Sequence, residues 1–233
     1  CPMPQSFPVD SLDTSGGIIL ISPAVCRVGR LQELDMSTVL PDFSDALADT
    51  VAAAAGGLVH VEGRDRLPAT GIVWDSEGLI VTSHHVLEWD ENINIGFQDG
   101  ESVGAELLGR DPSTDLALLR TSKRGSNVPD WADPKCLRVG HLALSLGRPG
   151  ANVRATMGIV AALGKAWRTP AGGLLDRYVQ TDTVMYPGFS GGPLVYAQVR
   201  FVGLNSSALL RGVSITIPAT TISRVARDLL ARG

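Results

Sequence analysis

Short apolar segments separated by turn-forming residues follow one another from residue 58 to residue 217, and this pattern constrains the fold most. The clearest turns are 75–78 (DSEG), between segments 70–74 and 79–82, and Asp99-Gly100, which follows the alternating segment 93–97. The other segments are 58–61, 103–108, 116–119, 142–146, 157–163, 178–181, 194–195, 201–204 and 213–217. Many short strands at near-regular intervals predict an all-β fold of antiparallel barrels or a sandwich.

A helix is predicted at each end of this strand region. The first is capped by Asp42 or Ser44 and ends at Gly56-Gly57. The second covers 220–231, is capped by Thr220 or Thr221, and has apolar residues at helical spacing. These residues are Ile222, Val225, Ala226, Leu229 and Leu230. We expect this C-terminal helix to pack over a barrel.

Residues 1–41 stand apart from this pattern because five prolines interrupt them and they show little periodicity. We interpret them as an N-terminal extension that wraps on the body or contacts another subunit. Alternatively, Met36 is the native start and the residues before it are foreign to the protein. Cys1 fits a lipoprotein or an artefact equally, and no signal peptide is recognisable in this chain.

Charge and composition exclude several partner classes. The formal net charge is −4, so no basic excess favours nucleic acid. No apolar run reaches the ~18 residues of a membrane span, and the nearest one, 17–28, is broken by Ser22, Pro23 and Arg27. The three cysteines allow at most one disulfide and do not have zinc-ligand spacing, so they do not indicate a zinc site. We also predict no organic cofactor.

The glycine-rich string 188–193 (GFSGGP) contains the first candidate for chemistry. Glycines on both sides of Ser190 allow a tight turn and a close substrate approach. The N–H groups of Gly188 and Ser190 can then form an oxyanion hole, although a glycine-rich loop with an ordinary serine fits as well. The string also matches the G-x-S-x-G elbow of α/β-hydrolases, but every histidine precedes Ser190, and that fold requires the opposite order.

A serine nucleophile needs a base and an orienting carboxylate. His84 and His85 follow the segment 79–82, and only one is expected to serve, because neighbouring side chains on extended chain point opposite ways. Asp115 lies where a polar turn becomes an apolar strand, whereas Asp111 precedes a proline and is interpreted as a turn former. Alone, each residue also fits a structural role. Together, His85, Asp115 and Ser190 have the chain order of the chymotrypsin-type triad.

Three strings resemble the trypsin-like serine proteases of the HtrA (Deg) family: 78–86 (GLIVTSHHV), 111–119 (DPSTDLALL) and 188–194 (GFSGGPL). Supporting strings are 137–140, 158–160, 180–182 and 215–218, and the resemblance covers residues 43–231. It implies a chymotrypsin-like double six-stranded antiparallel β-barrel with a short N-terminal helix and a C-terminal helix. The protease domain is then 42–233, with barrels at 57–125 and 136–218. By register, the family's triad falls on His85, Asp115 and Ser190.

The sequence departs from the family at three positions, where Ser83, Arg148 and Phe189 replace the usual asparagines. Phe189 matters most, because its peptide group lies between the amides of the expected oxyanion hole. Digestive proteases use an aspartate there to bind a new N-terminus. A phenyl ring cannot do this, so we expect no zymogen clip and control by ordering of residues 185–189. No PDZ domain follows the final helix, so we expect no peptide-sensing regulation of that type from this chain.

The resemblance also implies a substrate site. Val184, followed by Met185, falls at the floor of the first specificity pocket and provides no acid, which predicts cleavage after small or medium apolar residues. Leu204, Asn205 and Ser206 are expected to pair with the substrate backbone by β-augmentation.

The predicted function is a serine endopeptidase that acts on unfolded or loosely folded polypeptides through an acyl-enzyme. The alternatives are a non-catalytic peptide-binding or chaperone-like module and a structural subunit built around residues 1–41. Family members commonly form trimers and favour an extracytoplasmic location in the bacterial cell envelope, so both are expected here by resemblance.

Overall fold

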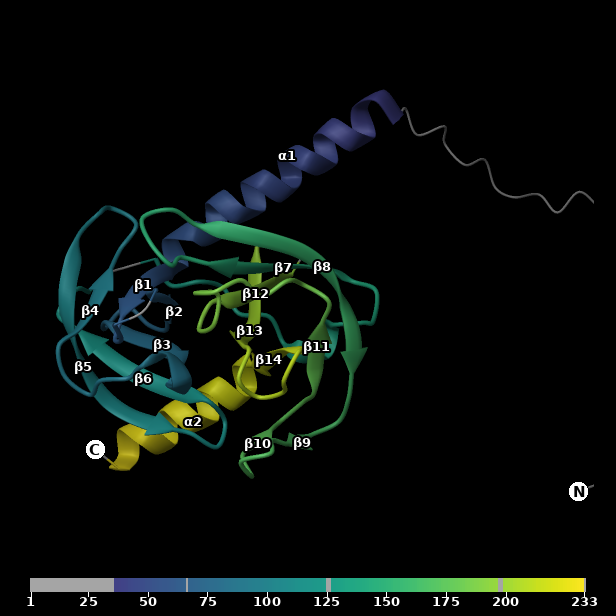
Figure 1. The fold of residues 1–233 in the computed structure, drawn as a ribbon. Helices are drawn as coiled ribbons and strands as arrows, with labels where there is room; N and C mark the ends of the chain where they lie inside the picture. Colours follow the sequence, from purple (N-terminus) through teal and green to yellow (C-terminus); the bar gives the residue numbers. More distant parts are fainter. Residues whose placement is uncertain (1–35, 66, 125–126, 197–198, 233) are drawn as a thin grey trace, which may run out of the picture.

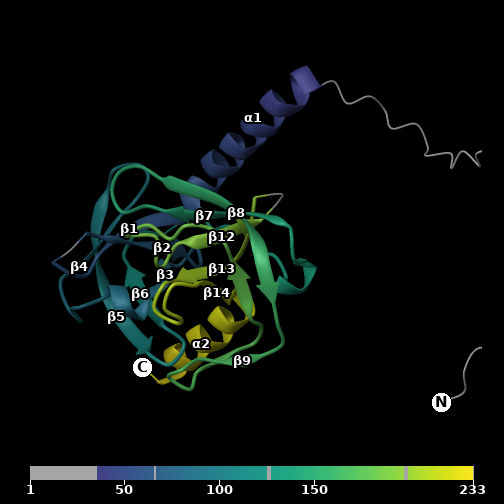
Figure 2. The same ribbon diagram turned by 45° about the vertical axis from the view of Figure 1, so that its right-hand side comes forward.

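The computed structural model describes residues 36–65, 67–124, 127–196 and 199–232. The predicted extension therefore lies largely outside the described residues. The first helix, α1 (Met36–Ala54), begins before the predicted caps and contains Pro41. A proline has a helix-compatible φ and removes a single N–H donor, so the helix continues across it at a cost. Figures 1 and 2 show α1 projecting away from the rest of the chain.

Six strands form the first closed antiparallel barrel, in the order β1-β2-β3-β6-β5-β4. They are β1 (Leu58–Glu62), β2 (Ala69–Val73), β3 (Leu79–Ser83), β4 (Ile93–Gly96), β5 (Ser102–Asp111) and β6 (Leu116–Thr121). Apolar side chains such as Val59, Ile80 and Ile95 fill its interior.

The second closed barrel has the order β11-β14-β13-β12-β7-β8. Its strands are β7 (Leu142–Gly147), β8 (Arg154–Leu163), β11 (Val179–Thr181), β12 (Pro193–Tyr196), β13 (Arg200–Ser206) and β14 (Ser214–Pro218). A small hairpin of β9 (Trp167–Arg168) and β10 (Leu174–Leu175) was not predicted, because two-residue strands show no periodicity. The prediction of a double six-stranded antiparallel barrel is confirmed.

The turn at 75–78 shows how local sequence sets the strand order. The Asp75 carboxylate accepts hydrogen bonds from the N–H groups of Glu77 and Leu79. Gly78 has a φ of +91°, and a Cβ there would lie 2.6 Å from the carbonyl oxygen of Thr121. Only glycine fits both conditions, so this turn joins β2 to β3 and lies against Thr121 at the end of β6, the strand that pairs with β3.

The C-terminal helix, α2 (Ala219–Arg232), follows β14 and packs on β13 and β14 of the second barrel and on β5 and β6 of the first (Figure 1). Its buried face, with Ile222 and Val225, belongs to one apolar cluster that also contains Leu116 of β6 and Ile217 of β14. The two barrels therefore share an apolar interface. Among the described residues, no helix combines the length and apolarity that a membrane-spanning helix needs.

Candidate active site

The register of two strands in the first barrel brings the candidate base to the candidate carboxylate. Ser83 at the end of β3 pairs with Leu116 at the start of β6. His85 lies just beyond β3, in the 3-10 turn η2 (His84–Val86), and Asp115 lies just before β6. The main chain continues the pairing, since the His84 N–H donates to the Asp115 carbonyl oxygen at 3.1 Å. Asp115 has a φ of +60°, a conformation that aspartate tolerates better than most residues.

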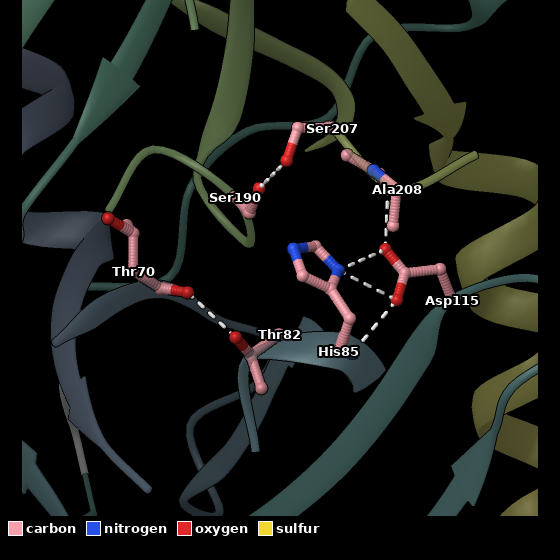
Figure 3. Close-up of polar contacts among 8 residues, drawn as sticks. Thr70, Thr82, His85, Asp115, Ser190, Ser207 and Ala208 are labelled. Atoms are coloured by element: carbon pink, nitrogen blue, oxygen red, sulfur yellow. Dashed lines mark hydrogen bonds and ion pairs between the residues drawn. The ribbon is translucent and has the colours of Figure 1, made fainter. Parts of the chain in front are cut away.

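The Asp115 carboxylate receives several hydrogen bonds from this arrangement (Figure 3). The imidazole Nδ1 of His85 lies 2.8 Å from Oδ2 and 3.0 Å from Oδ1, and the His85 N–H donates to Oδ1 at 2.9 Å. Ser206 at the end of β13 donates its hydroxyl to Oδ2 at 2.5 Å. Burial raises the pKa of Asp115, which is 3% exposed, but the bonds from His85 and Ser206 and the attraction of His85 hold it below the ordinary value. The carboxylate is therefore ionised at neutral pH.

His84 and Asp111, the neighbouring candidates, are placed differently. Among the described residues, the buried Nδ1 of His84 has no hydrogen-bond partner. Burial, followed by the nearby Arg110, lowers the pKa of His84. The Asp111 carboxylate accepts from Ser113 and Thr114 within its own turn, as expected of a turn former. His85 and Asp115 are thus the pair that the structure brings together.

The loop containing Ser190 makes a turn whose type follows from Pro187-Gly188. The Phe189 N–H donates to the Tyr186 carbonyl oxygen at 3.0 Å, and Gly188 has a φ of +91°. Proline at the second position and positive φ at the third define a type II turn. Within the described residues, the N–H groups of Gly188 and Ser190 donate no hydrogen bond. Both amides are therefore available to an oxyanion.

Glycine is also required directly after the serine. Gly191 has a φ of +87°, and a Cβ there would lie 2.0 Å from the Thr70 carbonyl oxygen. The nucleophile loop of the second barrel therefore packs main chain against main chain on β2 of the first. This close approach places Ser190 beside the barrel that contains His85.

The Ser190 hydroxyl points to another serine. Its Oγ lies 2.9 Å from Oγ of Ser207, and no hydrogen bond joins it to His85 in the described part of the chain. Figure 3 shows the imidazole between Asp115 and Ser190, with the Nε2 edge on the Ser190 side. The structure thus assembles the three predicted residues at one place, with the serine turned away from the base.

The two main departures from the family pattern have buried side chains. Phe189 is 0% exposed. Its ring packs edge-on against the Tyr186 ring, with 5.9 Å between the two ring centroids, and also lies against Gly147. Arg148 is also buried, and its guanidinium donates to the carbonyl oxygens of Ala151 and Ala55, the latter in the 3-10 turn η1 (Ala55–Gly57) after α1. Burial lowers the pKa of Arg148. Both side chains therefore support the loops around the site from inside.

The predicted substrate-binding residues differ in exposure and in how their backbone groups are bonded. Val184 is 54% exposed and Met185 is half-buried, so the structure does not enclose Val184 in a pocket. The backbone groups of Asn205 already form hydrogen bonds within the barrel. Its N–H donates to the Gly192 carbonyl oxygen, and its carbonyl oxygen accepts from the Gly191 N–H.

Leu204 pairs with β12 on one side and β14 on the other. Barrel closure therefore uses the backbone groups of Leu204 and Asn205, which leaves them no free edge for the predicted pairing with the substrate backbone. Ser206 is adjacent to the site, but its hydroxyl serves Asp115. In sequence, nothing marks this role or the contact of Ser207, because both depend on β13 ending beside the other barrel.

No group of three or more histidine, cysteine or acidic side chains arranged to hold a metal occurs among the residues that the structure describes.

Comparison with known proteins gives a family match over much of the chain. The trypsin-like peptidase domain family matches residues 69–204, more than half of the sequence. Among solved structures, the HtrA-type protease AlgW with a tripeptide is similar, with a TM-score of 0.68 and 27% identity over 78% of this chain and 63% of that one.

Curated relatives point to the same group. The serine protease Do-like HtrA of Bacillus subtilis is 29% identical and matches 96% of this chain and 50% of its own length. A probable periplasmic serine protease do/HhoA-like of Haemophilus influenzae is 30% identical over 91% of this chain and 49% of its own. The chain thus spans about half the length of these relatives. These matches, together with the two closed barrels, show that the chain belongs to the trypsin-like peptidase family and to its HtrA-type members.

Proposed function

We propose that this chain is a serine endopeptidase in which Ser190 is the nucleophile, His85 the general base and Asp115 the residue that orients the base. The observation that carries the proposal is the contact of the ionised Asp115 carboxylate with Nδ1 of His85, beside Ser190. In the described part of the chain, the N–H groups of Ser190 and Gly188 donate no hydrogen bond. A carboxylate on Nδ1 fixes the tautomer in which Nε2 can accept a proton. Family membership supports the same assignment.

The mechanism needs one change of conformation. Rotation about χ1 moves the Ser190 hydroxyl between staggered positions, from Ser207 toward Nε2 of His85. Hydrogen bonds of this kind are often long or misaligned before substrate binds. His85 then takes the proton as Ser190 attacks the scissile carbonyl, and Asp115 stabilises the imidazolium that forms.

The developing oxyanion accepts hydrogen bonds from the N–H groups of Gly188 and Ser190, and the type II turn leaves both free for it. The protonated His85 donates its proton to the leaving amine as the scissile C–N bond breaks, and an acyl-enzyme remains on Ser190. Water activated by His85 hydrolyses it. No step requires a metal or an organic cofactor. Packing of Phe189 under the loop, rather than a new N-terminus, is proposed to keep the 185–189 turn in this form.

The proposed substrates are unfolded or loosely folded polypeptides. An extended chain can add to the sheet only beyond the closed part of β13, so we place the substrate-pairing segment at Ser207 and Ala208, which are both exposed. Relatives named periplasmic support an extracytoplasmic location. The homo-trimer stays a prediction by resemblance.

We predict cleavage after small or medium apolar residues such as Val, Ala, Leu or Met, because neither Val184 nor Met185 provides an acid for a basic side chain. Digestion of a mixed peptide library, with the cut sites read by mass spectrometry, measures this preference. A preference for Lys or Arg at the cleaved position would contradict it.

The central test of the activity is covalent labelling with a fluorophosphonate, together with digestion of casein. The wild-type chain should be labelled and should cut casein, and Ser190→Ala should lose both, with a fall in kcat of about 10⁶-fold, as in comparable triads. Ser122→Ala, at an exposed position just after β6, is the matched control and should behave as wild type. A folded wild type that binds peptides but is neither labelled nor active would instead indicate a non-catalytic peptide-binding module.

Removing the competing hydroxyl should make Ser190 more reactive. Ser207→Ala abolishes the 2.9 Å contact with Ser190, and a neutral hydrogen bond of this kind is worth about 0.5–1.5 kcal/mol. We therefore expect the labelling rate constant to rise by about 2- to 10-fold. An unchanged or lower rate would show that Ser207 does not restrain the nucleophile.

A further inference from the structure

The residue that joins the nucleophile loop to the first barrel is Thr70 of β2, a residue outside every motif in the sequence. Its side chain is 0% exposed and its main chain belongs to the closed barrel. Its three polar atoms form hydrogen bonds with the second barrel or with the neighbouring strand β3. The Thr70 N–H donates to the Ser190 carbonyl oxygen at 3.3 Å. The Thr70 Oγ1 lies 2.7 Å from the Gly188 carbonyl oxygen and 2.7 Å from the backbone nitrogen of Arg148.

The direction of these bonds is fixed by chemistry. A hydroxyl has one hydrogen to donate and two lone pairs that accept. The Arg148 N–H can only donate, so Oγ1 accepts from it and gives its own hydrogen to the Gly188 carbonyl oxygen. One buried hydroxyl therefore ties together two loops of the second barrel, the one after β7 and the one before Ser190.

The other side of Thr70 faces the strand that leads to His85. Its carbonyl oxygen accepts from the Thr82 hydroxyl at 2.7 Å (Figure 3). Thr82 lies on β3, which ends at Ser83, immediately before the turn that contains His85. The chain of bonds therefore runs from the Ser190 loop through Thr70 to the strand that positions the base.

Hydrogen bonds to Thr70 and Tyr186 fix the peptide groups around Ser190. Both polar groups of the Gly188–Phe189 peptide form hydrogen bonds. The Gly188 carbonyl oxygen accepts from the Thr70 hydroxyl, and the Phe189 N–H donates to the Tyr186 carbonyl oxygen. The Ser190 carbonyl is held by the Thr70 N–H. Without the Thr70 hydroxyl, the Gly188 carbonyl and the Arg148 N–H would both lose a buried partner, and the loop would shift to satisfy them.

We propose that Thr70 is a positioning residue for the hydrolysis, one that sets the nucleophile loop of the second barrel in register with His85 and Asp115 of the first. This inference rests on the proposed function. Thr70 touches no reacting atom, so it acts on the rate through geometry. Misplacement of a reacting group by about 1 Å can lower the rate about 10²-fold. Binding of a peptide to the segment at Ser207 and Ala208 does not need such precise placement of Ser190.

The test compares Thr70→Ala with Thr70→Ser, which differ only in the hydroxyl, and adds Thr70→Val, which keeps the shape of threonine. For each folded protein, fluorophosphonate labelling gives a maximal rate and an apparent affinity, and a peptide ester gives kcat and KM. Thr70→Ser should stay within about 3-fold of wild type, whereas Thr70→Ala and Thr70→Val should lower kcat and the maximal labelling rate by about 10²-fold with KM nearly unchanged.

The matched control is Thr121→Val. Thr121 is also a buried threonine of the first barrel, at the far end of β6, and its Oγ1 lies 3.3 Å from the carbonyl oxygens of both Gly78 and Lys123. This variant should lose thermal stability as Thr70→Val does while keeping the labelling rate. If Thr121→Val lowers the rate equally, Thr70 acts through general stability and the inference fails.

The outcomes separate this inference from the proposed function. A wild type that is never labelled overturns the serine protease assignment. A labelled wild type with Thr70→Ala as fast as Thr70→Ser overturns the role of Thr70 alone. If Thr70→Val does not fold, the comparison of Thr70→Ala with Thr70→Ser decides, because the serine hydroxyl should restore the rate that the alanine variant lacks.

Discussion

The carboxylate of Asp115 is buried at the junction of the two barrels, and an ionised group can stay there only if polar partners replace water. His85 supplies its imidazole and its N–H, and Ser206 supplies a hydroxyl from the other barrel. Because these bonds lower the pKa of Asp115 below 3.8, their contribution to stability is present above pH 3.8 and is lost as the pH falls through the lowered pKa. The same bonds that make the fold tolerate the carboxylate also orient the imidazole.

The junction explains why two barrels are needed. His85 and Asp115 come from the first barrel, through the register of β3 and β6, whereas Ser190 and its flanking amides come from the second. An apolar cluster from both barrels and α2 holds the two barrels together. Within that rigid frame, close main-chain approach at Gly191 and the hydroxyl of Thr70 set the local geometry. The glycines of the motif thus serve packing between barrels as much as access for substrate.

The sequence predicts features that local patterns encode. Most barrel strands contain an apolar or alternating segment, and Asp75 with Gly78 marks a turn by its own chemistry. The motif strings also identify His85, Asp115 and Ser190, which the structure places together. Contacts between distant segments leave no such pattern. Thr70, Ser206 and Ser207 are ordinary hydroxyl residues in sequence, and their roles appear only when β2 and the end of β13 lie against the nucleophile loop. For the same reason, the backbone hydrogen bonds of Asn205 with Gly191 and Gly192 could not be predicted.

The most direct test of the account is the tautomer of His85, read by NMR of protein labelled with ¹⁵N at histidine and assigned by loss of the signal in His85→Gln. Donation to Asp115 requires the proton on Nδ1, with Nε2 free to accept from Ser190. We predict an Nδ1–H tautomer in the neutral wild-type imidazole and a redistribution toward Nε2–H in Asp115→Asn. A wild-type imidazole with its proton on Nε2 would contradict the account, since that ring could not act as the base.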